Sequence, residues 1–364
     1  MQGVGVGNDS PGQEVESRVL ALLRQKGLSI KNLSAKDKAE VTAVLRNLHI
    51  ERGVSLGDIA VLLGNKTSGY TSWLCKQLGI TARPFEEARL KGVREKRRKY
   101  ERRPFQGTVE ERAYLLGLRH GDLSVSRPWT GVVRVSTSTT HPAMAELFHS
   151  LFGRYGHIYE HPRYKEDTRS YEWNLSAILD SSFEFLFPRI SALRDWILSQ
   201  PSITVSYLAG LFDAEGSVGI YPAKRHTSLT VTYYNTDLDL LRFVHDAIGL
   251  LGFNPLLPYL DKKRGSRSPG YKIELKKDYW RVQVCRFEDS LGLLRSLPMR
   301  HREKIAKKAL ALTLSIGEPW SAVGPKVESV RASINAERDG FVAKAEAAFR
   351  VGHPGILPSG QDRT

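Results

Sequence analysis

An internal repeat restricts the fold of this chain more than any other feature. Residues 114–123 read YLLGLRHGDL and residues 207–216 read YLAGLFDAEG, a constant offset of 93 residues. Each copy is followed by a strand-like run (131–137 and 229–234), a polar break and an amphipathic helical pattern that ends near a glycine. We therefore expect an α+β protein with two tandem units of about 90–100 residues.

The repeated segment also carries a chemical pattern. Gly117 and Gly210 have no Cβ, so two helices that cross there can approach closely. Asp122 and Glu215 each follow that glycine by five positions, which would place both carboxylates near adjoining helix C-termini. Such carboxylates repel each other, and a hard divalent cation relieves the repulsion. We expect Mg²⁺ there, with Mn²⁺ able to substitute, in a site suited to phosphodiester hydrolysis.

The charge balance indicates a polyanionic partner. The chain has 54 Lys and Arg against 39 Asp and Glu, a formal net charge of +15. Nearly half of this excess lies in residues 89–103, which hold nine basic and two acidic residues. This run is either a solvated linker or a phosphate-contacting segment, and we expect the second. Its candidate contacts are Arg94, Arg97, Arg98, Arg102 and Arg103.

The same composition excludes several classes of protein. We find no apolar run of about 18 residues for a membrane span and no secretory pattern at the start. Two distant cysteines, Cys75 and Cys285, exclude a disulfide scaffold. We expect a protein of the prokaryotic cytoplasm or an organellar matrix that is not secreted.

Residues 55–80 resemble a helix-turn-helix. Ser55 is a good N-cap for a short amphipathic helix, and a Gly-bearing turn separates it from a second helix over 70–78. An ordinary helical hairpin is the alternative. If the segment binds DNA, its groove-facing residues are Tyr70, Thr71, Ser72 and Lys76.

Both decapeptides resemble the motif of LAGLIDADG homing endonucleases, and YLAGLFDAEG is a close match. The resemblance covers about residues 108–316 and is to the monomeric branch with two motifs. It implies two pseudo-twofold-related αββαββα units whose saddle-shaped antiparallel sheets lie along the DNA major groove. It also implies that both DNA strands are cut with short 3′ overhangs. By motif position, Asp122 and Glu215 would bind the metals, and we add the residues that follow them, Leu123 and Gly216, to the metal site.

The first copy departs from this family pattern, with Leu123 at a usual glycine and Arg119-His120 in place of an apolar-acidic pair. The resemblance further implies a basic residue near each metal. Lys304 is the candidate in the second unit, with Lys307 and Lys308 as alternatives, and Arg189 could substitute in the first. An arginine there would act only through its charge.

Base-reading side chains should alternate along the strands, because one sheet face meets the DNA. In the first unit the candidates are Arg127, Arg134, Ser136 and Ser138. In the second they are Tyr221, Lys224, Arg225, Thr230, Thr232, Arg281 and Gln283, with Lys262, Lys263, Arg264 and Arg267 from a basic loop along the backbone.

These observations predict the organisation of the chain. We expect a flexible start (1–13), a helical domain (14–88), a basic linker (89–107), two LAGLIDADG units (108–200 and 201–316) and a tail (317–364) with one helix over about 327–350. The predicted function is that of a monomeric, intron-encoded endonuclease acting on a double-stranded DNA site. An RNA maturase that binds intron RNA, or a non-cleaving DNA-binding regulator, would use the same scaffold.

Overall fold

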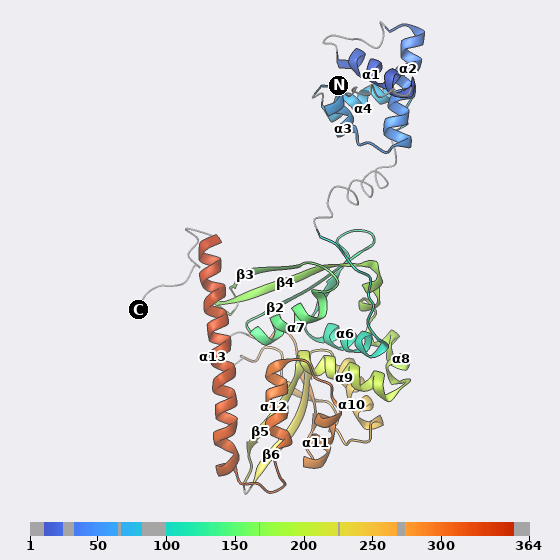
Figure 1. Cartoon of the computed structure of the whole chain (residues 1–364). Coiled ribbons are helices and arrows are strands. Elements are labelled where there is room, and N and C mark those ends of the chain that lie inside the picture. The colour runs from blue at the N-terminus through green and yellow to red at the C-terminus, as the bar shows by residue number, and fades with distance from the viewer. Residues whose placement is uncertain are drawn as a thin grey trace, which may run out of the picture. The chain divides into compact units, whose positions relative to one another are not determined.

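The computed structural model describes residues 11–24, 33–64, 67–81, 100–166, 168–224, 226–267 and 274–352. The chain divides into two compact units at Lys99 and Tyr100, and each is considered by itself (Figure 1). Four of the candidate DNA contacts lie outside the described residues: Arg94, Arg97, Arg98 and Arg225.

The first unit consists of helices. These are α1 (Pro11–Arg24), α2 (Ala35–Arg46), the π-helical turn η2 (Asn47–Glu51), α3 (Leu56–Leu62) and α4 (Ser68–Gln77). Ser55 caps α3 as predicted, because its Oγ accepts a hydrogen bond of 3.1 Å from the backbone N–H of Asp58. The apolar side chains of these helices share a core of their own, which includes Leu45, Ile59 and Leu74. The two short helices of the predicted hairpin are therefore present and packed together.

The second unit repeats one order of elements. The first repeat contains α6 (Val109–Gly121), β1 (Ser124–Ser126), β2 (Val132–Thr139), α7 (Pro142–Phe152), β3 (Ile158–Lys165), β4 (Ser170–Asp180), η3 (Ser181–Leu186), η4 (Ile190–Ala192) and α8 (Arg194–Leu198). The second contains α9 (Pro201–Glu215), β5 (Gly216–Pro222), β6 (Thr227–Asn235), α10 (Leu238–Leu250), β7 (Tyr259–Lys262), β8 (Tyr279–Val284), α11 (Phe287–Ser296) and α12 (Arg302–Leu312). The long helix α13 (Trp320–Gly352) follows.

Each repeat builds an antiparallel four-stranded sheet. The strand orders are β1-β2-β4-β3 and β5-β6-β8-β7, so the second sheet copies the connectivity of the first. Both predicted strands exist, as β2 and β6. Their alternation sets the two faces: Val133 and Val135 are buried against the helices, whereas Arg134 and Ser138 are exposed on the other face. The tandem α+β fold predicted from the repeat is confirmed.

The two repeats meet at α6 and α9, where the predicted glycine contact is reciprocal. A Cβ on Gly117 would overlap the carbonyl oxygen of Tyr207, and a Cβ on Gly210 would overlap the carbonyl oxygen of Tyr114. Both separations would be far below the 3.0 Å that real Cβ atoms keep. Only glycine at both positions lets the backbones approach this closely.

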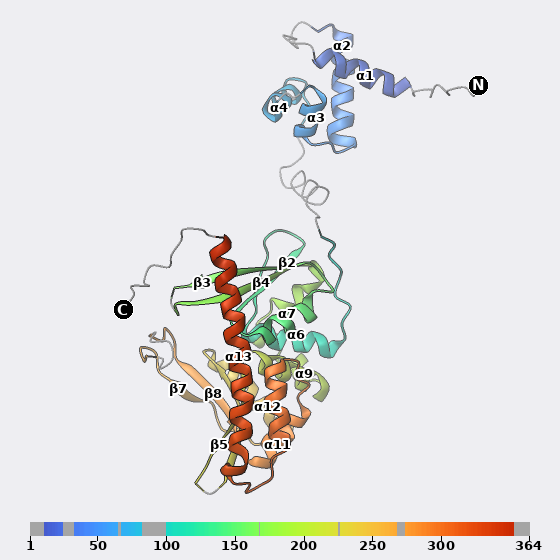
Figure 2. The same ribbon diagram turned by 60° about the vertical axis from the view of Figure 1, so that its left-hand side comes forward.

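The helix predicted over 327–350 begins earlier and serves both repeats. Near its start Val323 and Val327 are buried, and α13 contacts β5 of the second repeat there. Further along, Phe341 packs on Trp173 of β4, so the helix runs past both sheets (Figure 2). Neither α13 nor any other helix within the described ranges is apolar enough over a sufficient length to cross a membrane.

Residues just before α6 belong to the second unit. The backbone N–H of Arg103 donates a 2.8 Å hydrogen bond to the carbonyl of Tyr155, and Phe105 packs on Phe183 and Phe185. The part of the expected linker that the structure describes is thus anchored on the first repeat.

Candidate metal centre and nucleic-acid interface

The two predicted metal-binding acids lie at adjoining helix ends. Asp122 is the C-cap residue of α6, and Glu215 is the last residue of α9. The preceding residue of the first copy, Gly121, is packed so tightly that a Cβ there would meet Ala214 and the Cγ of Glu215. The close crossing of the two helices therefore brings both C-termini, and with them both acids, to one place.

Electrostatics at this place favour the loss of one negative charge. Burial, and to a smaller extent the charge of Asp122, raise the pKa of Glu215 to about 7, although the charge of Lys304 opposes both. Burial of part of the Asp122 carboxyl also raises its pKa, although one side of the residue is open to solvent. The charges of Lys304 and His141 oppose this effect. A cation bound between the two carboxylates would stabilise the ionised form of both.

The donor set fits a hard divalent cation with an open coordination shell. Across the described part of the chain, no cluster brings together three or more His, Cys, Asp or Glu side chains for a metal. Mg²⁺ commonly takes one or two protein carboxylates and completes its shell with water and substrate phosphate. Backbone oxygens next to the acids, at Leu123 and Gly216, are the remaining candidate ligands from the chain.

Lys304 sits at the negative end of α9. Its Nζ donates three hydrogen bonds, to the carbonyl oxygens of Phe212 (2.6 Å), Asp213 (2.7 Å) and Ala214 (2.9 Å). Burial lowers the pKa of Lys304 to about 8, although the nearby acids favour its charged form. The lysine therefore caps the helix that carries Glu215. The alternative Lys308 is bonded elsewhere, to the carbonyl of Leu297 at 2.7 Å.

The structure does not bring Arg189 to the acids. This arginine is exposed at the start of η4, and no hydrogen bond or ion pair joins it to Asp122 or Glu215 within the described ranges. The neighbouring residue Pro188 is the one that contacts the first motif helix: its carbonyl accepts a 3.2 Å hydrogen bond from Nε2 of His120. The predicted substitution of an arginine for a lysine in the first repeat is not supported by this geometry.

Asp213 is a buried acid that sequence reasoning left without a role. Its Oδ2 accepts hydrogen bonds from the Tyr114 hydroxyl (2.5 Å) and from the backbone N–H groups of Arg300 (2.6 Å) and His301 (3.1 Å). Burial nevertheless raises its pKa. These contacts hold the segment before α12, and hence Lys304, against the end of α9.

A second missed group joins the two repeats beside the acids. Nδ1 of His141, the N-cap residue of α7, lies 2.9 and 3.0 Å from the two carboxylate oxygens of Glu303 on α12. The two residues are 162 positions apart, and neither belongs to a recognisable motif, so no sequence signal pairs them.

The first sheet presents the predicted readers on its exposed face. Arg134, Ser136 and Ser138 share that face of β2. Arg127 is exposed as well, with its guanidinium over the Phe187 ring and 3.4 Å from Glu184. Strand β3 adds side chains to the same face that sequence reasoning missed, because it pairs with β4 in the register Tyr159↔Ser176 and His161↔Asn174.

In the second sheet, some of the predicted base readers are exposed and others are buried. Tyr221 and Lys224 are exposed. Thr230 and Thr232 are only 3% exposed, so they lie beneath their neighbours and are not available as base readers in this structure. Close packing explains this, since the Oγ1 of Thr230 fills the space beside Gly219.

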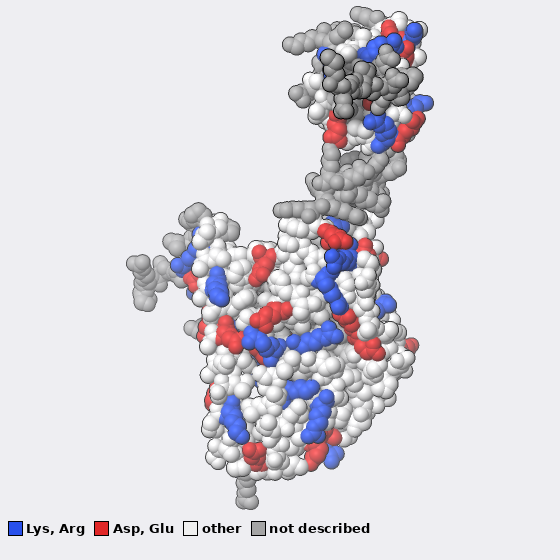
Figure 3. All heavy atoms as spheres, in the orientation of Figure 1, with Lys and Arg blue, Asp and Glu red and all other residues white. Residues whose placement is uncertain are grey.

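Later strands of the second sheet hold their polar residues in pairs. Arg281 is 3.2 Å from Asp261 and stacks on Tyr259, whose hydroxyl donates to Gln283 at 2.8 Å. The basic loop residues Lys262, Lys263, Arg264 and Arg267 are all exposed. On the side of the molecule seen in Figure 3, basic and acidic side chains are interspersed.

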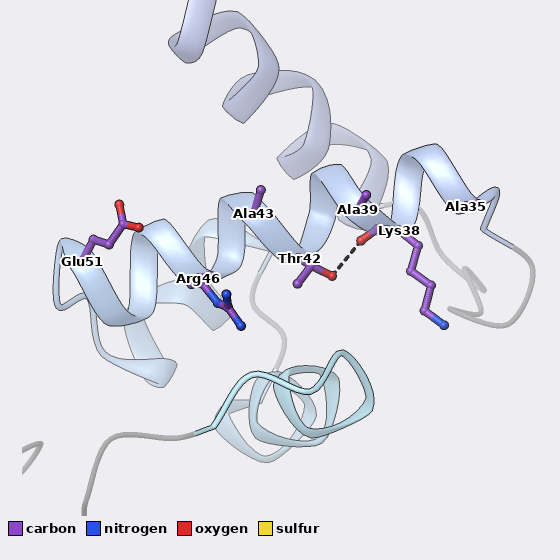
Figure 4. A pocket seen from close by; sticks show the side chains of 7 residues that line it. All are labelled: Ala35, Lys38, Ala39, Thr42, Ala43, Arg46 and Glu51. Carbon is purple, nitrogen blue, oxygen red and sulfur yellow. Dashed lines mark hydrogen bonds between the residues drawn. The ribbon is translucent and has the colours of Figure 1, made fainter.

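In the first unit, α4 offers part of the predicted surface. Ser72 and Lys76 are exposed and Tyr70 is half-buried, but Thr71 is fully buried and faces the core instead. Trp73, which was not predicted, is 49% exposed on the same helix. A separate groove follows α2 and η2 (Figure 4) and is lined by Ala35, Lys38, Ala39, Thr42, Ala43, Arg46 and Glu51. Glu51 is the one acid that lines this groove, so the groove has no pair of carboxylates that could hold a metal as Asp122 and Glu215 could.

Of the two arginines of the basic run that the structure describes, Arg102 lies over the Trp129 ring at 6.0 Å and Arg103 lies 3.4 Å from Glu101. Both therefore belong to the surface of the second unit.

Comparison with known proteins assigns the second repeat to a class. Residues 202–290 match the family model described as the LAGLIDADG-like domain. This segment contains α9 from its second residue onward and the whole second sheet, and it is a LAGLIDADG-like domain. Because the first repeat has the same order of elements and the same sheet connectivity, the chain carries this fold in tandem.

Solved structures of homing endonucleases are similar to this chain at low identity. I-DmoI in complex with DNA and Ca is 19% identical with a TM-score of 0.34, covering 52% of this chain and 89% of its own. I-WcaI bound to its DNA recognition sequence is 13% identical with a TM-score of 0.38, covering 57% and 88%. The N-terminal LAGLIDADG domain of DUF199/WhiA is 15% identical with a TM-score of 0.34, covering 61% and 96%. No curated protein matches the chain.

Proposed function

We propose that this chain is a site-specific endonuclease that cuts both strands of a DNA site, as an intron-encoded homing endonuclease does. The observation that carries the proposal is the juxtaposition of Asp122 and Glu215 at two helix ends, with the pKa of Glu215 raised to about 7. Two acids held at adjoining helix ends, one exposed and one half-buried, repel each other and have little structural use, but they suit a metal-assisted reaction.

A divalent cation held by these acids would polarise the scissile phosphate and stabilise the leaving oxygen. The chain's own residues do the rest. The exposed faces of the two sheets orient the duplex through side chains such as Arg134, Ser138 and Tyr221. Lys304 holds the end of α9, so that the Glu215 carboxylate keeps a fixed direction. We propose Mg²⁺ as the working metal, with Mn²⁺ as a substitute, and a single chain as the active form.

We further propose that the first unit and the basic run extend the contact with DNA. Ser72 and Lys76 on the exposed side of α4 would contact the target in the manner of a helix-turn-helix, and exposed Arg103 would contact phosphate. We infer cleavage ends with short 3′ overhangs from the resemblance to the family.

A cleavage selection tests the proposal. The full chain is incubated with a randomised or genomic DNA library, with and without Mg²⁺, and the new ends are sequenced. We expect discrete Mg²⁺-dependent ends with short 3′ overhangs. The double variant Asp122→Asn, Glu215→Gln should bind the selected site without cutting it. Site enrichment without new ends in any divalent metal would contradict the nuclease and favour a regulator or an RNA maturase.

A further inference from the structure

The hairpin of β3 and β4 extends past the core of the first repeat. Strand β3 lies at the edge of its sheet, and the core helix α7 packs on β2 and β4. Within the described ranges, the element that β3 contacts extensively, apart from its sheet neighbour β4, is α13. A two-stranded hairpin is marginally stable in water unless it packs against a helix or further strands. Helix α13 is therefore the main support of this edge of the sheet.

The face of the hairpin toward α13 is aromatic. Tyr171 and Trp173 lie on the same face of β4 as the buried Leu175, because side chains alternate along a strand. The ring centres of Phe349 and Tyr171 are 5.6 Å apart, and those of Phe341 and Trp173 are 5.9 Å apart. Nε1 of Trp173 also donates a 3.2 Å hydrogen bond to the carbonyl of Phe341. The C-terminal part of α13 thus holds the hairpin on this face (Figure 2).

The opposite face of the hairpin carries polar side chains beside the candidate readers of β2. Asn174 of β4 is paired with Ser138 on one side and with His161 of β3 on the other, so these three share one face. Tyr159 and Arg163 lie on it too, two residues to either side of His161. Tyr159 is 44% exposed, and His161 and Arg163 are exposed as well. The hairpin therefore presents a row of exposed side chains on the face proposed to meet DNA and rests on α13 with the other.

The second sheet has the equivalent hairpin without this support. Its edge strand β7 has four residues, whereas β3 has eight, and the pairing of β7 with β8 shifts register between Leu260 and Lys262. Leu260 is paired with Trp280, on the same face of β8 as the buried Val282. In the first sheet α13 covers the corresponding face, yet Leu260 is 41% exposed, and among the described residues no helix makes extensive contact with β7. The supported hairpin is thus long and regular, and the unsupported one is short and irregular.

We infer that α13 holds the β3–β4 hairpin in position to read DNA, and that Phe341 and Phe349 are positioning residues for base recognition. This inference rests on the proposed nuclease function. Side chains that read bases discriminate well only when the element that carries them is rigid. Because α13 supports β3 and leaves β7 unsupported, base pairs beneath the β3–β4 hairpin should be read more strictly than those beneath the β7–β8 hairpin. Recognition of one half-site of the duplex then depends on a helix on the far side of the sheet.

Binding measured base pair by base pair tests this inference. Each base pair of the selected site is replaced in turn, and the Kd is measured without Mg²⁺, so that cleavage does not interfere. Arg163→Ala identifies the base pairs beneath the β3–β4 hairpin, and Gln283→Ala those beneath the β7–β8 hairpin. Beneath β3–β4 we expect the wild-type chain to discriminate by about 10-fold or more, and the double variant Phe341→Ala, Phe349→Ala by about 2-fold. Discrimination beneath β7–β8 should be weaker in the wild-type chain and should not change in the double variant.

Control variants separate positioning from folding. Val351→Ala alters an 83% exposed side chain of the same helix and should change nothing. Phe341→Tyr keeps a ring against Trp173 and should retain the wild-type discrimination. Equal weakening at every base pair, or no effect of Arg163→Ala at any position, would overturn the inference while leaving the nuclease intact. A wild-type chain that binds its site but never cuts would contradict only the proposed function, and one that binds no site would contradict both.

Hydrogen exchange of the wild-type chain tests the support without DNA or substitution. Backbone N–H groups that join β3 to β4 should exchange about 10-fold or more slowly than those that join β7 to β8, because an unsupported hairpin opens locally at lower cost. Phe341→Ala should speed exchange in β3 and leave α6 and α9 unchanged, which also shows that this variant is folded. Equal protection of the two hairpins in the wild-type chain would overturn the inference.

Discussion

The hydroxyl of Tyr114 in the first repeat donates a 2.5 Å hydrogen bond to Asp213 in the second. The equivalent residue, Tyr207, donates to Nδ1 of His120 at 2.7 Å, so the contact is made twice across the pseudo-twofold axis. Residues 120 and 213 are themselves 93 positions apart, which is the offset of the repeat. His120 therefore occupies the place of an acid and makes the same crossing contact.

The two copies differ in hydrogen-bond polarity. Asp213 accepts from backbone N–H groups, whereas His120 has a carbonyl partner, Pro188, and must donate to it through Nε2. Burial lowers the pKa of His120, in agreement with a neutral ring. The unusual residue in the first motif is thus matched to its own partner and does not disturb the helix end.

Tyr207→Phe should destabilise the second unit by about 1–3 kcal/mol, because it leaves a buried nitrogen of His120 without its donor. The free energy of unfolding in urea measures the effect. Tyr279→Phe, on an exposed strand residue, is the matched control and should change nothing. Equal free energies of unfolding for the two variants would show that the Tyr207–His120 hydrogen bond does not stabilise the fold.

Gly117→Ala should destabilise the second unit by at least about 1–3 kcal/mol, since a methyl group would overlap the backbone of the partner helix. Gly210→Ala should do the same. Gly249→Ala is the control, because nothing lies within 4 Å of its added Cβ, and alanine favours a helix. Urea unfolding compares the three. Unchanged stability of both interface variants would contradict the close crossing.

The Glu215 carboxyl should cost the metal-free protein stability as pH rises from 4.5 to 7, against the opposite contribution of His301, whose pKa burial lowers to about 3. The pKa of Glu215 is about 7 in the fold against 4.5 ordinarily, so between these values the folded chain binds more protons than the unfolded chain. The loss should amount to roughly 1–3 kcal/mol. Thermal unfolding across pH measures it, and Glu215→Gln should remove it while Glu288→Gln should not. Added Mg²⁺ should stabilise the protein at pH 8 and have little effect at pH 5.

Removal of residues 1–99 should weaken DNA binding mainly through phosphate interactions. The second unit has its own core, so the shortened chain should fold. The slope of log affinity against log salt should fall by about 0.9 for each phosphate that the removed residues neutralise. Titrations at several salt concentrations give this slope for both chains. An unchanged slope would mean that the first unit does not bind the phosphate backbone.

Much of the fold could be predicted because the repeat fixes it. The offset between Gly117 and Gly210 predicted the helix crossing, and the alternation in β2 predicted which face of the sheet is exposed. Capping by Ser55 predicted the start of α3. These features depend on residues close together in sequence or on a symmetry visible in it.

Other features depend on contacts that sequence patterns do not carry. Thr71 and Thr232 have the polarity of surface residues, yet close neighbours bury them. His141 and Glu303 meet only because two repeats pack together, and Arg189 is exposed at the start of η4 without a bond to either acid. The helix pattern of α13 was visible, but nothing in it indicated contact with both sheets.

The position of α13 has a consequence for synthesis. This helix is the last element that a ribosome produces among those the structure describes, and it covers Tyr171 and Trp173 on a strand made long before. Domains generally fold as they emerge, N-terminal parts first. The aromatic strip of the nascent first repeat therefore stays uncovered until α13 has been synthesised. A chain released early would retain both acids but expose that strip, which makes it a substrate for chaperones and proteases.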